Sequence, residues 1–95
     1  MQYMPAVLLA HAKEARDDGS IVEIIVWELP DPLPSSTHRY KYRLYFGAAG
    51  VTRVRYDNER GKGDHRHVNG VEQPFHFVSL SKLLDEFQRD VENWR

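Results

Sequence analysis

The chain has 95 residues, which is enough for one small domain with a single hydrophobic core. Hydrophobic residues make up 41% and charged residues 28%, a balance that is ordinary for a folded globular protein and excludes wholesale disorder. Thirteen basic and fourteen acidic residues give a net charge of -1, which argues against a generic nucleic-acid coat protein.

Cellular location and redox chemistry are also limited by composition. No apolar run approaches the roughly 20 residues of a membrane span, and the N-terminus lacks the layout of a signal peptide. We therefore expect a cytoplasmic protein that makes no contact with membranes. The absence of cysteine excludes disulfides, thiolate metal sites and a cysteine nucleophile.

The N-terminal third predicts a β-hairpin. Residues 5–16 contain helix-favouring Ala, Leu, Lys and Glu, but they stand just before Asp18-Gly19, a strong hairpin signal. The run 21–29 is β-branched and nearly continuous in its apolarity, as in a central strand covered on much of both faces. Three prolines between residues 30 and 34 end this second strand.

A second hairpin follows. From residue 38 the chain alternates between two kinds of side chain, which predicts a half-buried strand. One face collects Tyr40, Tyr42, Leu44 and Phe46, and the other collects Arg39, Lys41, Arg43 and Tyr45. Matching apolar faces with the return strand 51–57 places Arg43 opposite Arg53 and Lys41 opposite Arg55, around a loop of about three residues. The expected result is a basic patch whose like charges need carboxylates or an anion nearby.

The C-terminal third predicts one edge strand and one helix. Asn69-Gly70 indicates a turn, residues 74–78 a short edge strand, and Ser79 an N-cap. Apolar residues then recur at helical spacing: Leu80, Leu83, Leu84, Phe87, Val91 and Trp94. We predict a single α+β domain over residues 1–95. It is an antiparallel meander of about four to five strands, whose apolar face is covered by the C-terminal amphipathic helix and whose basic face is open.

The densest polar chemistry lies in residues 56–67. Gly61 and Gly63 flank Lys62, as in a turn that binds an anion, although the spacing is not that of a P-loop. Beyond the turn, an extended backbone sends His65 and His67 to one side and Arg66 to the other. The candidate catalytic residues are His65, His67, Asp64, Lys62 and Arg66. The candidate substrate-binding residues are Arg60, Arg43, Arg53, Lys41, Arg55 and Tyr45.

A metal site is the weaker interpretation of this stretch. Asp64, His65 and His67 need a distant fourth ligand such as His38 or His76, and the neighbouring cations repel a divalent ion. We therefore expect neither a metal nor another cofactor.

The chain resembles the TumE-type toxins of bacterial and archaeal toxin–antitoxin pairs over nearly its whole length. The motifs that carry the resemblance are Asp17-Asp18-Gly19-Ser20, Trp27-Glu28-Leu29-Pro30, His38-Arg39-Tyr40-Lys41-Tyr42-Arg43, Tyr56-Asp57-Asn58-Glu59-Arg60-Gly61-Lys62-Gly63-Asp64-His65-Arg66-His67 and Pro74-Phe75. The resemblance implies a cytoplasmic toxin neutralised by a helix-turn-helix antitoxin encoded nearby, but no agreed reaction. It also favours a strand over residues 5–16, and a homodimer is compatible with it.

The residues themselves favour RNA cleavage without a metal. One of His65 and His67 takes the 2′-OH proton, and the other, or Asp64 by orienting it, assists departure of the 5′ oxygen. Cations at positions 60, 62 and 66 stabilise the phosphate as it becomes five-coordinate, and Arg43 and Arg53 hold flanking phosphates. Two alternatives stay open: a non-catalytic module that binds RNA or a protein, and a transferase toxin with a nucleotide bound around Lys62.

Overall fold

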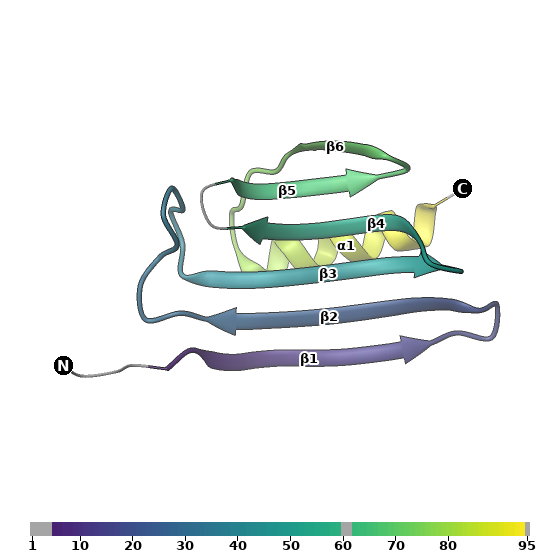
Figure 1. Ribbon diagram of the computed structural model, residues 1–95, viewed down its shortest axis with the longest axis horizontal. Coiled ribbons are helices and arrows are strands. Elements are labelled where there is room, and N and C mark those ends of the chain that lie inside the picture. The colour runs from purple at the N-terminus through teal and green to yellow at the C-terminus, as the bar shows by residue number, and fades with distance from the viewer. Residues whose placement is uncertain (1–4, 60–61, 95) are drawn as a thin grey trace.

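The computed structural model describes residues 5–59 and 62–94, which form one antiparallel sheet and one helix (Figure 1). Six strands lie side by side in chain order. They are β1 (Val7–Ala15), β2 (Ser20–Glu28), β3 (Tyr40–Ala48), β4 (Val51–Glu59), β5 (Gly63–Val68) and β6 (Val71–Pro74), and the helix α1 spans Leu80–Asn93. The predicted α+β meander is confirmed. The predicted four to five strands are wrong, because the polar stretch after β4 pairs with it as a strand of its own.

The first hairpin forms as predicted from the Asp-Gly signal. β1 pairs with β2 up to Ala15 opposite Ile21, despite the helix-favouring alanines of β1. At the turn, the backbone N–H and the hydroxyl of Ser20 donate to the Asp18 carboxylate at 2.9 and 2.6 Å. These hydrogen bonds hold the pKa of Asp18 below its usual value. The hydrogen bonds of the turn therefore outweigh the helix propensity of residues 5–16.

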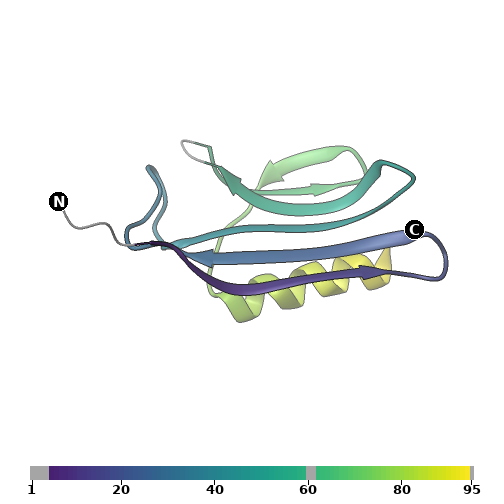
Figure 2. The same ribbon diagram turned by 60° about the horizontal axis from the view of Figure 1, so that its bottom comes forward.

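The core lies between α1 and one face of the sheet (Figure 2). It contains Val26, Tyr42, Leu44, Phe46, Val54, Tyr56, Leu83, Phe87 and Val91, all buried. Ser79 caps the helix as predicted, since its side chain accepts a hydrogen bond from the backbone N–H of Lys82 at 3.1 Å. No helix in the described part of the chain has the length and apolarity that crossing a membrane requires.

The β3–β4 hairpin departs from the predicted register. Its turn has only two residues, Ala49 and Gly50, whose φ angles of 52° and 76° are those of a tight primed turn. An irregularity between Phe46 and Gly47 then makes Arg53 the extra residue of a bulge in β4. As a result Arg43 pairs with Asp57, and the predicted opposition of like charges is wrong.

The tight turn can be tested at Gly50. A Cβ added there would meet no atom within 4 Å, so replacement by alanine costs only the left-handed backbone strain. We expect Gly50→Ala to lower the free energy of unfolding by about 1 kcal/mol, and Gly50→Asn by less, because asparagine tolerates this backbone conformation better. Urea titrations of the two variants measure the difference, and equal stability of wild type and Gly50→Ala would contradict the two-residue turn.

Two further predictions about strands need correction. The edge strand expected over 74–78 is instead β6, which begins earlier and ends at Pro74 because the Asn69-Gly70 turn reverses the chain directly after β5. β2 is not covered on both faces. Val26 is buried beneath the helix, whereas Ile25 and Trp27 are only partly buried on the opposite face, which α1 does not cover.

Candidate functional site

The face of the sheet that α1 does not cover is called the open face below. It carries Glu23, Ile25 and Trp27 of β2, Lys41, Arg43 and Tyr45 of β3, Arg55 and Asp57 of β4, and His65 and His67 of β5. The prediction that both imidazoles share one side and Arg66 takes the other is confirmed. Asp64 and Arg66 face the helix, so the predicted catalytic residues do not form a single cluster.

Arg66 connects the sheet to the helix. Its guanidinium binds both oxygens of Asp90 on α1, with Nε to Oδ2 at 2.8 Å and Nη2 to Oδ1 at 2.9 Å. Nε also donates to the Tyr56 hydroxyl at 2.8 Å, and that hydroxyl donates to Asp90. The hydrogen bond that Arg66 donates to Asp90 raises the pKa of Arg66, and burial raises the pKa of Tyr56. These contacts fix β5 against the helix.

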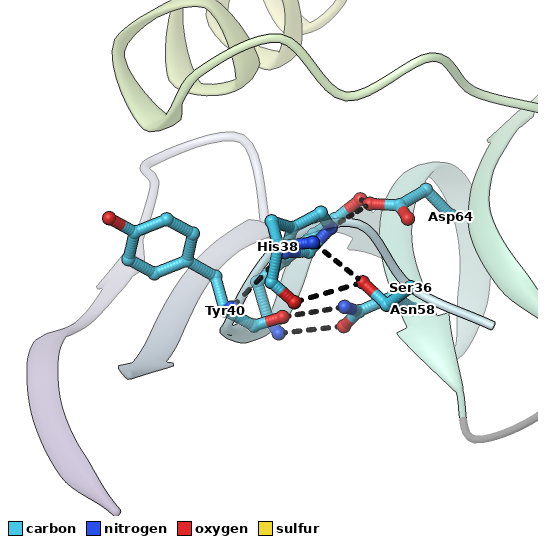
Figure 3. Close-up of polar contacts among 6 residues, drawn as sticks. Ser36, His38, Tyr40, Asn58 and Asp64 are labelled. Atoms are coloured by element: carbon cyan, nitrogen blue, oxygen red, sulfur yellow. Dashed lines mark hydrogen bonds and ion pairs between the residues drawn. The ribbon is translucent and has the colours of Figure 1, made fainter. Parts of the chain in front are cut away.

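Asp64 lies in a second cluster on the helix side, with His38 (Figure 3) and with Tyr42. The Tyr42 hydroxyl donates to Asp64 Oδ2 at 2.5 Å, and His38 Nε2 lies 2.9 Å from the same oxygen. His38 Nδ1 accepts the backbone N–H of Tyr40 at 3.1 Å, so the ring proton must be on Nε2, which donates it to Asp64. Burial raises the pKa of Tyr42. The side chains of His38 and Asp64 are only 8% and 11% exposed.

This second cluster resembles a catalytic histidine–carboxylate pair but has no nitrogen free for a substrate. Both nitrogens of the His38 ring are occupied, and the ring stacks on Phe77 at a centroid distance of 3.9 Å. Asn58 stiffens the same region by bonding the backbone on both sides, to Tyr40 O at 2.7 Å and from Tyr42 N at 2.9 Å. The cluster therefore joins the start of β3 to β5. Positions 38 and 64 are too far apart for any local spacing to have indicated their contact.

On the open face, the two histidines have different surroundings. His65 Nε2 donates to the carbonyl of Lys62 at 2.8 Å, and Nδ1 lies 3.6 Å from the Glu72 carboxylate. His67 stands beside Arg55, its partner on β4. Arg55 Nε lies 3.2 Å from the Asp57 carboxylate. The face thus holds two imidazoles next to a guanidinium.

Three nitrogen atoms on this face are buried without a hydrogen-bond partner in the described part of the chain. They are Arg55 Nε, His65 Nδ1 and His67 Nδ1. Buried polar atoms of folded proteins nearly always have a partner, so an isolated exception calls for an explanation. Here all three lie on directly paired strands, within one small area of the open face. Arg55 Nε and His65 Nδ1 each face a carboxylate without hydrogen-bonding geometry, and His67 Nδ1 is the member of the group that has neither contact within the described residues.

The predicted substrate-binding residues are divided by the fold. Arg43, Lys41, Arg55 and Tyr45 share the open face, and the Arg43 guanidinium lies 5.1 Å from the centre of the Tyr45 ring. The bulge instead turns Arg53 towards the helix side, where its guanidinium lies 4.1 Å from the centre of the Trp94 ring, so its predicted place in the basic patch is wrong. Arg60 lies outside the described residues.

The remaining predicted site features are a turn and a weak metal candidate. Lys62 is exposed in the turn that opens β5, and Gly63 beside it has a φ of 78°, as expected of a glycine that lets the backbone approach a ligand. The side chain of Asp64 points away from those of His65 and His67, which separates the three proposed ligands. Within the described ranges, no group of three or more His, Asp or Glu side chains is arranged to hold a metal ion.

In a comparison with protein families, the chain matches the family described as Toxin TumE over residues 6–95. The chain belongs to the TumE family. The match covers nearly the whole chain and confirms the resemblance that the sequence motifs carry, so a toxin role follows for this protein. No match was found among curated proteins or among solved structures. The target of this TumE toxin must therefore be argued from its own residues.

Proposed function

We propose that this TumE toxin is a metal-independent endoribonuclease whose reaction takes place on the open face, at His65 and His67. The observation that supports the proposal is the grouping of Arg55 and these two histidines on paired strands, where three buried nitrogens make no hydrogen bond in the described part of the chain. A phosphodiester offers oxygen acceptors that would satisfy such donors. Histidine is also the side chain best suited to exchange protons at neutral pH.

The proposed reaction is an internal transesterification. A base removes the proton of a ribose 2′-OH, the 2′ oxygen attacks the adjacent phosphorus, and the bond from phosphorus to the 5′ oxygen breaks. An acid gives a proton to that departing oxygen. The products are a 2′,3′-cyclic phosphate and a 5′-OH, so one proton is taken up and one is given, and neither water nor a redox partner enters this step.

His67 fits the role of base. Its Nδ1 is buried, and Nε2 makes no hydrogen bond within the described part of the chain, so Nε2 is the nitrogen left for proton exchange. His65 fits the role of acid, because its two nitrogens face a carbonyl and a carboxylate, and only a ring with both protons satisfies two acceptors. The Glu72 side chain is about half exposed at 51%, so it can move aside when substrate approaches.

The neighbouring cations provide the charge that the transition state needs. Arg55 lies directly beside His67, and Arg43 lies one strand further across the face. We assign Arg55 and Lys62 to the reacting phosphate and Arg43, Lys41 and Tyr45 to the flanking nucleotides. Asp64 and Arg66, which face the helix, act as positioning residues that hold β5 in place. A helix-turn-helix antitoxin encoded nearby would neutralise the toxin.

The fate of total cellular RNA after brief expression tests the proposal. We expect wild type to degrade RNA and the His65→Ala/His67→Ala double variant to leave it intact. His11→Ala is the matched control, since His11 is exposed on β1, three strands away from β4, and should not change cleavage. Purified wild type should still cleave RNA in the presence of a chelator.

Other outcomes would separate the competing functions. Intact RNA with growth still arrested would overturn the nuclease, and saturable nucleotide binding to purified protein would then favour the transferase. Cleavage that stops with the chelator would contradict the metal-independent mechanism. If charge reversal at Arg43 abolished toxicity while the double histidine variant stayed toxic, a non-catalytic binding module would be the better interpretation.

A further inference from the structure

The open face also carries an apolar hollow whose walls include Ile25 and Trp27, two residues that have no role in the assignments above. It has a volume of about 210 Å³ and is lined by Ile25, Trp27, Lys41, Tyr42 and Arg43. Trp27 is directly opposite Lys41 on the neighbouring strand, and Ile25 is opposite Arg43. The hollow therefore combines an indole and an aliphatic wall with two cationic side chains.

Trp27 lies on the open face of β2 and is only partly buried there. Its neighbour Val26 is 2% exposed in the core, whereas Trp27 points to the face that has no covering layer in the described part of the chain. No other aromatic ring among the described residues stacks on it, although His38, Tyr40, Tyr42 and Phe77 stack on one another nearby on the helix side. A large flat ring left available in this way can stack on a ligand.

The charges beside the ring select the kind of ligand. Lys41 is exposed, and the Arg43 side chain is 48% exposed, with the Glu23 carboxylate at 3.4 Å. The residues that line the hollow include no acid. An aromatic surface with adjacent cations is the arrangement that binds single-stranded nucleic acid, where the ring stacks on a base and the cations bind phosphates.

We propose that the Trp27 hollow is a base-stacking subsite for single-stranded RNA, at a distance from the scissile phosphate. This inference rests on the proposed function, because it gives a second contact to the same substrate. Ile25, Arg43, Asp57 and His65 are successive cross-strand partners from β2 to β5. Trp27 is two residues from Ile25 along β2, so it lies three strands across and two residues along from His65. Strand geometry makes that about 14 Å across the strands and about 7 Å along them. A bound strand would cross β3 and β4 between the two places (Figure 1).

The position predicts a dependence on substrate length. A dinucleotide held at the histidines is too short to reach Trp27, whereas a hexanucleotide can occupy both places. Trp27→Ala should then lower kcat/KM for the hexanucleotide about 5- to 150-fold, the effect of losing one stacked base. The same variant should leave cleavage of the dinucleotide unchanged, and Trp27→Phe, which keeps a ring, should retain most of the activity on the hexanucleotide.

Fluorescence can report binding without any cleavage. The chain has two tryptophans, and Trp94 lies on the helix side against Arg53, so Trp94→Phe leaves Trp27 as the single emitter. A hexanucleotide with 2′-O-methyl groups has no 2′-OH proton to lose and should quench Trp27 without being cut. Quenching should saturate and weaken as salt increases, and Lys41→Gln should weaken binding further. Because Trp27 is retained in this experiment, it does not depend on the folding of Trp27→Ala.

The outcomes distinguish this subsite from the nuclease proposal. Saturable quenching of Trp27 by RNA, in a protein that cleaves no RNA, would support the subsite and overturn the nuclease proposal. The subsite would be overturned, and the nuclease proposal kept, if the protein cleaved RNA but its Trp27 emission did not change when RNA was added. In that case Trp27→Ala would lower cleavage of the dinucleotide and of the hexanucleotide by the same factor. Quenching by a protein partner but not by RNA would also overturn it.

Discussion

His67→Ala should lower the rate of RNA cleavage by about 10²- to 10⁴-fold, the usual contribution of one general base. The expected reason is that Nε2 of His67 makes no hydrogen bond in the described part of the chain and, unlike Nδ1 of the same ring, is not a buried nitrogen. Single-turnover cleavage of a defined oligonucleotide measures the loss. Far-UV circular dichroism and a urea titration check that the variant is folded.

The pH dependence of the rate separates the two histidines. Loss of the base should remove the rise of the rate on the acidic side, because activity no longer depends on deprotonating His67. Loss of the acid in His65→Ala should remove the fall on the alkaline side and leave the acidic rise. Two variants with the wild-type bell shape and only a lower maximum would mean that neither histidine transfers a proton.

The alternation of side chains made much of the fold predictable. Tyr40, Tyr42, Leu44 and Phe46 lie on the predicted side of β3, and Leu83, Phe87 and Val91 form the buried stripe of the predicted helix. Alternation also placed His65 and His67 together, because a period of two follows from any extended backbone. These predictions required only the type of element and not its partners.

Register and long-range contacts were not predictable in the same way. The residue opposite Arg43 is set by the length of the β3–β4 loop and by the bulge at Arg53. The sequence 47–50 is compatible with loops of two or three residues, and the bulge has no distinct sequence signal, so this residue could not be predicted. The contact of Asp64 with His38 depends on the path of the whole β3–β5 meander. Asp64 was therefore predicted beside the histidines, although its side chain binds His38 and Tyr42 on the opposite face.

The two faces of β5 divide the work between stability and chemistry. Towards the helix, Asp64 and Arg66 are fixed by multiple hydrogen bonds to β3, β4 and α1. Towards the open face, the neighbouring histidines and Arg55 retain nitrogens that make no hydrogen bond in the described part of the chain. A strand held firmly on one side can present reactive groups on the other without losing their geometry. This division makes opposite predictions for substitutions at adjacent positions.

Asp64→Ala should therefore act on stability and not on the chemical step. It removes the acceptor shared by the Tyr42 hydroxyl and His38 Nε2, and leaves both donors without it in a site where His38 is only 8% exposed. We expect the free energy of unfolding to fall by about 2–6 kcal/mol, since each of the two buried donors left unpaired costs about 1–3 kcal/mol. Urea titrations followed by circular dichroism measure the change. Asp64→Asn, whose amide oxygen can still accept, should lose less.

Asp85→Ala is the matched control, because Asp85 is an exposed aspartate on α1 and its removal should change stability by no more than about 0.5 kcal/mol. Cleavage per folded molecule of Asp64→Ala, measured where the variant is still native, should stay within a few-fold of wild type. If Asp64→Ala instead had normal stability and no cleavage activity, Asp64 would have to take part in the reaction. The open face could then not contain the whole site, since the Asp64 carboxylate lies on the helix side of β5.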